Sequence, residues 1–190
     1  ENIYVIDSPI LSNSQFDKFS DFFKNSIRIL DCTFDIKKSL KERLDELCSE
    51  AETAVREGIK HLILSDKEID EKRSSIPMAI TIGAINSRLI NLGIRGFASI
   101  NVQTSEVLDT HSFSVLIGVG ATTINPYIAL DSIHQRQQKK LFGKMNFEEC
   151  IQRYIKSIDN GLLKIMSKMG ISVLSAYRGG CNFEAVGLSR

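Results

Sequence analysis

Short apolar stretches rich in β-branched residues alternate with longer helical patterns along most of this chain. The expected strands are residues 27–33, 60–65, 95–101 and 171–175. The expected helices are residues 39–58, 76–93, 110–121, 125–138 and 146–170. Strands that alternate with helices through short connections favour a parallel sheet, because each helix returns the chain to the same end of the sheet. We therefore predict an α/β fold: a mainly parallel sheet of about four or five strands, flanked by helices on both faces.

Two of the expected helices differ from an ordinary surface helix. Residues 76–93 are almost wholly apolar between Pro77 and Gly93, so we expect this helix to be buried on most sides. Residues 146–170 form the longest helical pattern, which we expect to be broken or bent near Gly161. The apolar helix should therefore be among the most buried elements of the fold.

The beginning of the chain departs from the alternating pattern. It reads as an extended segment, a turn at Pro9 and a helix capped by Ser12 or Asn13. We therefore divide the chain into an N-terminal segment, residues 1–25, and an α/β domain, residues 26–190. We expect the N-terminal segment to make fewer contacts than the domain and to be more mobile.

Charge and hydropathy narrow the range of partners. The 190 residues carry a formal net charge of +1, which gives no electrostatic case for nucleic acid or for an acidic membrane surface. No apolar run approaches the ~20 residues that a membrane span needs. The first residues lack the basic start and apolar stretch of a signal peptide, and Glu1 in place of a methionine indicates a chain cut from a longer one. We expect neither nucleic acid nor a membrane among the partners.

The cysteines and histidines show no metal-ligand spacing. The cysteines are Cys32, Cys48, Cys150 and Cys181, without a CxxC pair or a tight cluster. We therefore expect no zinc or iron–sulfur site within this chain. Thiols scattered through helix and strand patterns are typical of reduced, buried cysteines in a cytosolic protein.

The glycine-bearing stretch from Gly118 to Asn125 is a candidate for a binding turn. Gly118 and Gly120 precede an expected helix start with Asn125 as its cap, and amides at a helix start attract anions. However, Thr123 stands where the dinucleotide fingerprint requires its third glycine, and no Gly-Lys-Ser/Thr follows. The other interpretation, a helix that ends in glycines before a tight connection, stays open.

Two isolated polar residues are weaker candidates. Asp66 follows an expected strand at its carboxyl end, where α/β enzymes place function, but it also begins a charged loop, residues 66–75, and is equally a loop cap. His111 lies two residues after Asp109, a pairing that favours either a general base or a histidine bonded to groups at a helix start. Because neither has a nucleophile or a metal ligand beside it in the sequence, we predict no catalytic residue in this chain.

Five blocks of sequence carry a family resemblance. They are SPILSN (8–13), LILSDK (62–67), IPMAITIGAINSRLINLGIR (76–95), HSFSVLIGVGATTINPY (111–127) and GLLKIMSKMGISVLSAYRGGCNFEAVGLS (161–189). Together, in this order, they closely resemble the central domain of the large subunit of glutamate synthase, over nearly the whole chain. The resemblance implies a rudimentary or truncated TIM-barrel-like domain that runs into the start of the synthase domain.

The resemblance also implies the surroundings of this domain. The parent is a cytoplasmic or plastid enzyme that makes two L-glutamate from L-glutamine and 2-oxoglutarate. An amidotransferase domain releases ammonia, and an FMN-binding synthase domain with an iron–sulfur cluster consumes it. The central domain links the two, faces them with residues 1–25, contributes to the ammonia tunnel and holds no cofactor of its own.

One part of the family pattern can be carried over residue by residue. In the family, the turn after the PIL sequence is associated with the narrowest part of the ammonia tunnel, and Ser12 and Asn13 stand there. The resemblance therefore implies a tunnel role for both residues. The other interpretation is that Ser12 caps a helix that begins near Gln15.

Two further functions remain open from the residues alone. The chain is alternatively a small independent flavin- or phosphate-binding α/β enzyme that uses the Gly118–Asn125 turn. A third interpretation is an inert folding fragment with an exposed face that binds a partner. Flavin binding would favour the independent enzyme, and self-association would favour the inert fragment with an exposed face.

Overall fold

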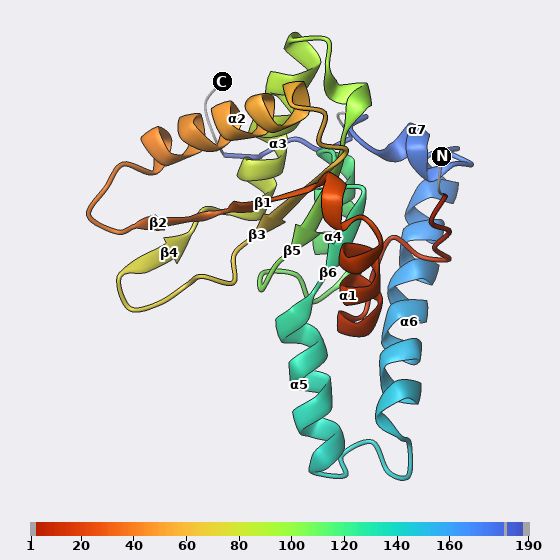
Figure 1. The fold of residues 1–190 in the computed structure, drawn as a ribbon. Helices are drawn as coiled ribbons and strands as arrows, with labels where there is room; N and C mark the ends of the chain where they lie inside the picture. Colours follow the sequence, from red (N-terminus) through yellow and green to blue (C-terminus); the bar gives the residue numbers. More distant parts are fainter. Residues whose placement is uncertain (1–2, 181, 188–190) are drawn as a thin grey trace.

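The computed structural model describes residues 3–180 and 182–187. Its main sheet has four parallel strands in the order β1, β3, β5, β6 (Figure 1). Their bounds are β1 Ile27–Asp31, β3 His61–Ser65, β5 Ser99–Gln103 and β6 Thr123–Asn125. This arrangement confirms the predicted α/β class with a mainly parallel sheet.

Seven α-helices connect and flank these strands within the described residues (Figure 1). They are α1 Asn13–Phe22, α2 Leu40–Arg56, α3 Met78–Asn91, α4 Thr110–Gly118, α5 Tyr127–Gln138, α6 Phe147–Lys168 and α7 Leu174–Tyr177. Short 3-10 turns occupy Lys24–Ser26 and Arg95–Phe97. The helix starts follow their capping residues: Ser39 Oγ accepts from the Glu42 amide at α2, and Asn146 and Glu149 form a reciprocal capping box at α6.

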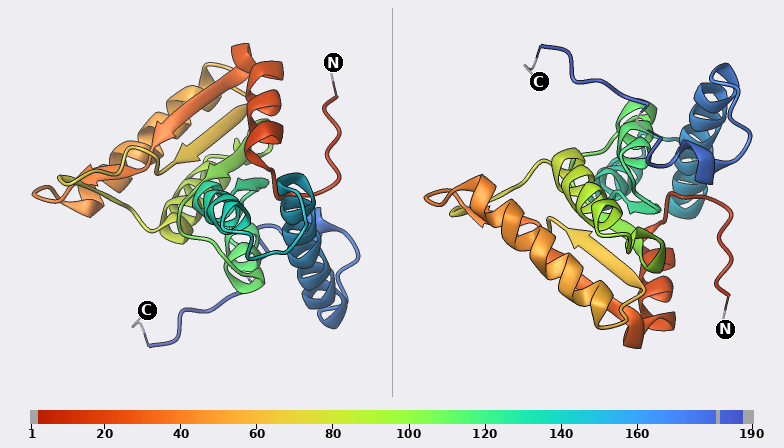
Figure 2. Two further views of the ribbon diagram at one scale, coloured as in Figure 1. Left: turned by 90° about the horizontal axis from the view of Figure 1, so that it is seen from below. Right: turned by 90° about the horizontal axis from the view of Figure 1, so that it is seen from above.

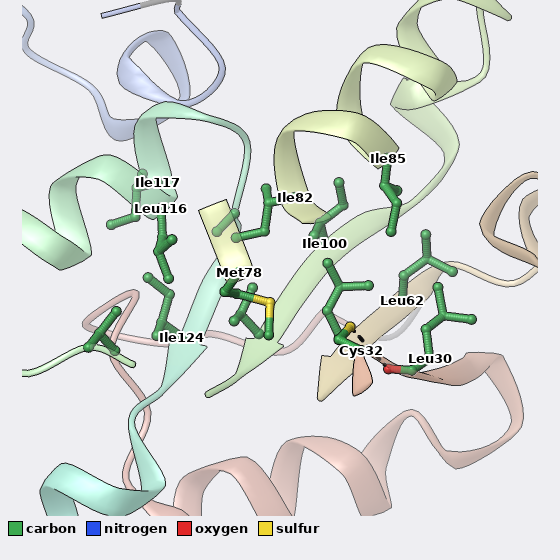
Figure 3. Packing of buried hydrophobic residues seen from close by; sticks show 14 of the residues in the cluster. Leu30, Cys32, Leu62, Met78, Ile82, Ile85, Ile100, Leu116, Ile117 and Ile124 are labelled. Atoms are coloured by element: carbon green, nitrogen blue, oxygen red, sulfur yellow. Dashed lines mark hydrogen bonds between the residues drawn. The ribbon is translucent and has the colours of Figure 1, made fainter. Parts of the chain in front are cut away.

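One face of the sheet carries the main hydrophobic core. The register places Leu30, Leu64, Val102 and Ile124 in one row across the four strands. Side chains of α3 meet this row and its neighbours, as Figure 3 shows for Met78, Ile82, Ile85, Leu62 and Ile100. Helices α2 and α3 lie side by side over this face (Figure 2, right). Burial of each such aliphatic side chain stabilises the fold by about 1.5–3 kcal/mol.

Helix α3 is less enclosed than its composition predicts. Six of its residues are buried, but Ile80 and Ile90 are exposed, so the helix buries one broad face rather than most of its surface. The longest helix, α6, is continuous through Gly161. A side chain at Gly161 would place its Cβ 2.4 Å from Thr110 Cγ2, so this glycine permits the close approach of α4 and α6.

The opposite face of the sheet is covered by α1. Phe16 and Phe19 of α1 and Leu11 before it pack on Ile63 of β3. Ile10 forms an isolated parallel bridge with Ile124, so the N-terminal segment lines the outer edge of β6. Ile10, Leu11, Phe16 and Phe19 are buried, so the segment packs on the sheet from Ile10 onward, whereas Ile3 and Val5 are exposed. The expected higher mobility of residues 1–25 stays a prediction. Residues 1–2 lie outside the described residues.

The strand predicted at 171–175 does not form. Gly170 ends α6, the Ile171 amide donates to the Met166 carbonyl, and the chain turns into the short helix α7. The edge of β6 is already occupied by residues 9–11, which exchange backbone hydrogen bonds of 2.8 and 2.9 Å with Ile124. The residues after Gly170 therefore cannot extend the sheet next to β6.

Three further strand boundaries correct the sequence analysis. Strand β5 lies at residues 99–103 rather than 95–101, because a 3-10 turn precedes it. The helix predicted over 125–138 begins two residues later, at Tyr127, because Asn125 is the last residue of strand β6. The charged segment 66–75 ends in strand β4 (Arg73–Ser75), which pairs antiparallel with β2 (Thr33–Asp35) as a small separate ribbon.

Candidate functional site

The face of the sheet that α1 covers is lined mainly by polar side chains, and we call it the inner face. Alternate residues of neighbouring strands share a face, and the register aligns residues 61, 63 and 65 of β3 with residues 99, 101 and 103 of β5. The polar members of this face are Asp31, His61, Ser65, Ser99, Asn101, Gln103, Thr123 and Asn125, and Asp31 forms an ion pair with Arg73. Polar groups in such a place must find partners within the fold.

The first polar row crosses the amino-terminal half of the inner face. His61 Nδ1 lies 2.8 Å from Ser99 Oγ, and Asn101 Nδ2 donates to the same oxygen at 3.0 Å. Thr123 Oγ1 completes the row by donating to Asn101 Oδ1 at 2.8 Å. Burial lowers the pKa of His61, whose ring stacks against Phe23 with a centroid distance of 4.0 Å. This row is a closed structural network that includes a neutral histidine.

The second polar row lies at the carboxyl ends of the strands. Ser65 Oγ donates to Gln103 Oε1 at 3.1 Å, and Gln103 Nε2 donates to Asn125 Oδ1 at 3.2 Å. Asn125 Nδ2 then donates to the Leu11 carbonyl at 3.0 Å and to Asn13 Oδ1 at 2.9 Å. We call these residues the amide relay: Ser65, Gln103, Asn125 and Asn13. The carboxyl ends of parallel strands are where barrel-related folds build functional sites.

Ser12 and Asn13 meet the amide relay at the start of α1. Ser12 is the N-cap of this helix: its Oγ accepts from the Gln15 amide, and the Gln15 side chain accepts from the Ser12 amide at 2.9 Å. The predicted capping role of Ser12 is therefore confirmed. Asn13 is exposed and joins the relay through its Oδ1 atom.

The segment before α1 is tied to the domain at further points. Ser8 Oγ donates to Asp159 Oδ1 of α6 at 2.8 Å, and burial raises the pKa of that carboxyl. The Ile124 amide donates to the Pro9 carbonyl at 2.8 Å, and the Leu11 amide donates to the Ile124 carbonyl at 2.9 Å. Residues 9–11 are thus held along the outer edge of β6, and Ser12 and Asn13 follow at the carboxyl end of that strand.

Asp66 lies in the loop above the same edge and is fully buried. Its carboxylate accepts from Thr104 Oγ1 at 2.7 Å, from Ser105 Oγ at 3.0 Å and from the Ser105 amide at 2.9 Å. Burial, together with the charge of Asp66, raises the pKa of Tyr127 to about 12. These bonds anchor the loop after β5 to the end of β3, which is what the loop-cap interpretation predicts.

The backbone amides of residues 119–122, within the Gly118–Asn125 stretch, are bonded inside the fold. The amides of residues 119–122 donate to backbone carbonyls of Val115, Ile117, Leu116 and Ile100. Gly118 lies against the Phe183 ring, where a Cβ would approach to 2.3 Å. Gly120 has φ +133° and faces the Asn86 side chain. These glycines allow close packing, and the amides of residues 119–122 are not available for an anion.

His111 forms no hydrogen bond with Asp109 among those of the described residues. It is exposed at the second position of α4, and its ring meets Phe183 edge-on at a centroid distance of 6.2 Å. The Asp109 carboxylate instead accepts from the Ser112 hydroxyl at 2.6 Å and from the Ser112 amide at 2.9 Å, which lowers the pKa of Asp109. The structure therefore places Asp109 as a helix cap and gives His111 no bond to it.

The described residues contain neither a metal cluster nor a spanning helix. No group of three or more histidine, cysteine, aspartate or glutamate side chains among them is arranged to hold a metal ion. Within the same ranges, no helix is long and apolar enough to cross a bilayer. Cys181 lies outside the described residues, and the described cysteines carry free thiols.

Sequence reasoning missed Gln103 and Asn125 as members of this site. The stretch 99–103 alternates polar and apolar residues, which is the signal of a strand with one polar face. Parallel strands are usually buried on both faces, so the general pattern predicts apolar residues on both sides of this strand. The Asn-Pro pair at 125–126 was interpreted as a helix start, so Asn125 was assigned as a cap.

The family comparison matches almost the whole chain. The glutamate synthase central domain family matches residues 1–189. The chain is similar to the large chain of NADPH glutamate synthase of Azospirillum brasilense, with 47% identity over 188 residues. It is also similar to the chloroplastic ferredoxin-dependent glutamate synthase of Oryza sativa subsp. japonica (40% identity) and to the NADPH glutamate synthase large chain of Bacillus subtilis (37%). These alignments cover 96–98% of this chain but only 12% of each relative.

A solved structure supports the fold assignment alone. A mutant flavocytochrome b2 with benzoylformate, a TIM-barrel flavoenzyme, matches with a TM-score of 0.53 and 11% identity. The match covers 93% of this chain and 42% of that chain. The parallel strands described above thus correspond to part of a barrel, as the TIM-barrel-like expectation states.

Proposed function

The chain belongs to the glutamate synthase central domain family, and on this premise we propose that it is a non-catalytic domain linking the two reaction centres of a glutamate synthase. The proposed parent makes two L-glutamate from L-glutamine and 2-oxoglutarate, in the cytoplasm or a plastid. Its amidotransferase and FMN-binding synthase domains are the proposed partners, with residues 1–25 facing them. FMN and the iron–sulfur cluster are bound outside these residues.

The placement of Ser12 and Asn13 carries the channel part of this proposal. Both stand at the start of α1, on a segment fixed to the carboxyl edge of the sheet by Ile124 and Asn125. We assign them to the wall of the ammonia tunnel. Neutral hydroxyl and amide groups suit that task, because they offer hydrogen bonds to ammonia without a charge that would hold ammonium.

Residues of the amide relay support the same task, because Ser65, Gln103 and Asn125 carry no charge. Ser65 donates to Gln103, and Gln103 donates to Asn125. The relay behind Asn13 therefore consists of hydroxyl and amide groups that neither gain nor lose a proton near neutral pH. The domain in this proposal orients and confines ammonia, and both chemical steps occur in its neighbours.

The first test replaces the two tunnel residues in the full-length enzyme. Asn13→Leu removes the amide, and Ser12→Phe adds bulk, so both should lower the ratio of glutamate synthesised to glutamine hydrolysed. Ser14→Leu is the matched control, because Ser14 is the next residue and is also exposed. The measurement is of both half-reactions in the same sample. A ratio equal to that of the natural sequence in Asn13→Leu and Ser12→Phe would remove both residues from the tunnel.

A second test separates this function from an independent flavin- or phosphate-binding enzyme. We expect the 190-residue chain alone to hydrolyse no glutamine and to retain no flavin after titration with FMN. The internally bonded amides of the Gly118–Asn125 turn are the reason for the second expectation. Cooperative unfolding of the same sample establishes that it is folded. Turnover of glutamine or a bound yellow cofactor would favour the enzyme.

A further inference from the structure

The amide relay has a direction that one backbone atom fixes. A carbonyl oxygen only accepts hydrogen bonds, so the Asn125 atom 3.0 Å from the Leu11 carbonyl is the donor Nδ2. The other end of that amide, Oδ1, then faces Gln103 Nε2 at 3.2 Å. Asn125 is 1% exposed and cannot exchange these partners for water. Its orientation is therefore determined by the backbone of the N-terminal segment.

The orientation of Asn125 determines that of Asn13. Asn125 Nδ2 has a second hydrogen, which it donates to Asn13 at 2.9 Å. Only the Oδ1 end of the Asn13 amide can accept it. Among the hydrogen bonds of the described residues, Nδ2 of Asn13 has no protein acceptor, and the residue is exposed. The end of Asn13 that remains for a ligand is thus a pure hydrogen-bond donor.

A pure donor distinguishes the two forms of ammonia. Neutral ammonia has a lone pair and accepts a hydrogen bond, whereas ammonium carries only donors and accepts none. We infer that Asn125 is a positioning residue that turns the donor end of Asn13 toward the ammonia path, so that the path selects neutral ammonia over ammonium. This inference rests on the tunnel role proposed for Asn13. Ser65 and Gln103 contribute by holding Asn125 in place.

The first variant exchanges donor for acceptor at nearly the same shape and also adds a negative charge. Asn13→Asp retains an oxygen for Asn125 Nδ2 but replaces the free donor with a second carboxylate oxygen. In the full-length enzyme, the ratio of glutamate synthesised to glutamine hydrolysed should fall about fivefold, the factor that corresponds to one neutral hydrogen bond of about 1 kcal/mol. Because Asn13 is exposed, this variant is expected to fold.

The positioning role is tested by Asn125→Asp against a matched control. A carboxylate at position 125 has no donor for Asn13 Oδ1, so Asn13 turns its own Nδ2 inward and the ratio should fall as in Asn13→Asp. The control is Asn101→Asp, which introduces the same charge at a side chain that is also 1% exposed and also donates to a backbone carbonyl, that of Leu62. Asn101 bonds Ser99 and Thr123 rather than Asn13, so its ratio should stay at that of the natural sequence.

The outcomes separate this inference from the function beneath it. A lowered ratio in Asn13→Asp and Asn125→Asp, with Asn101→Asp unchanged, supports the positioning role. Natural ratios in Asn13→Asp and Asn125→Asp, while Asn13→Leu uncouples the reactions, overturn the inference and leave the tunnel. A natural ratio in Asn13→Leu overturns both the positioning role of Asn125 and the tunnel role of Asn13. An equal loss in Asn101→Asp also overturns the inference, because any buried charge would then suffice. If Asn125→Asp does not fold, a natural ratio in Asn13→Asp while Asn13→Leu uncouples the reactions still overturns the inference.

Discussion

Single residues show how the domain tolerates a polar face inside a parallel sheet. Among the described residues, no buried side-chain nitrogen or oxygen lacks a hydrogen-bond partner. The inner face achieves this mainly with amides and hydroxyls, which donate and accept at once and so form chains across strands. A buried charge in the same place would require a counter-charge. The two polar rows therefore fix the positions of their side chains through hydrogen bonds between amides, hydroxyls and the His61 ring.

The half-buried histidine of the inner face, His61, gives a dependence of stability on pH. Burial lowers the pKa of His61 below its ordinary value of 6.5, so the unfolded chain binds the proton more readily than the folded one. Its contribution to stability is present above pH 6.5 and is lost as the pH falls through the lowered pKa of the folded state. As the pH falls below 6.5, the free energy of unfolding should therefore decrease more steeply for the natural chain than for the His61→Gln variant. Denaturant titrations at several pH values test this, and parallel curves would contradict it.

Gly120 is expected to be the glycine least tolerant of substitution. Its φ of +133° disfavours a side chain, and a Cβ there would lie 2.7 Å from Asn86 Cγ. Asn86 cannot move easily, because Arg95 donates to its Oδ1 at 2.6 Å and to the Gly120 carbonyl at 3.0 Å. Gly120→Ala should lower the free energy of unfolding by at least about 2 kcal/mol.

Gly96→Ala is the control for that substitution. Gly96 has no atom within 4 Å of its virtual Cβ and no left-handed φ. Its replacement should change the free energy of unfolding by no more than about 0.5 kcal/mol in chemical denaturation. Equal losses in the two variants would show that the Asn86 contact is not the cause.

At the scale of elements, the N-terminal segment replaces the strand that the sequence predicts at 171–175. Residues 9–11 line the edge of β6, and α1 covers the inner face through Phe16 and Phe19. The segment therefore protects an edge that would otherwise be open to pairing with another chain. Helices α5 and α6 form an antiparallel pair that extends away from the sheet (Figure 1).

The contribution of this segment can be measured at Ile10. Ile10 is fully buried and belongs to the main core, so Ile10→Ala should lower the free energy of unfolding by about 2–5 kcal/mol. Ile3→Ala is the matched control, because Ile3 is 82% exposed in the same segment and its loss should be close to zero. If Ile10→Ala were as stable as Ile3→Ala in denaturant titration, the segment would not be part of the folded core.

At the scale of the whole molecule, the sequence patterns predicted the architecture better than the site. Strands β1 and β3 and the helices α2, α3 and α6 were expected near their observed places, because their apolar patterns are strong. Helices α2 and α6 also begin at capping residues. Strand β6 was missed because three residues after a glycine turn give little local signal. Its existence depends on pairing with β5 on one side and with Ile10 on the other.

The members of the site were less predictable than the helices and strands, because they are brought together by pairing between distant segments. Ser12 and Asn13 were proposed from family resemblance, and Ser12 also from its capping pattern. The contact between Asn13 and Asn125 joins residues 112 positions apart, and only the register of β6 brings them together. No local pattern encodes such a contact, because it arises from the path of the chain across the sheet.

The central claim, that this domain conducts ammonia between two reaction centres, is tested most directly by following the nitrogen itself. The full-length enzyme is given glutamine with a heavy-nitrogen amide in the presence of unlabelled ammonium, and the label in newly synthesised glutamate is measured by mass spectrometry. We predict that the natural enzyme transfers the label undiluted, whereas Asn13→Leu dilutes it with solvent ammonium and Ser14→Leu does not. Equal retention of label in Asn13→Leu and in the natural enzyme would contradict the account.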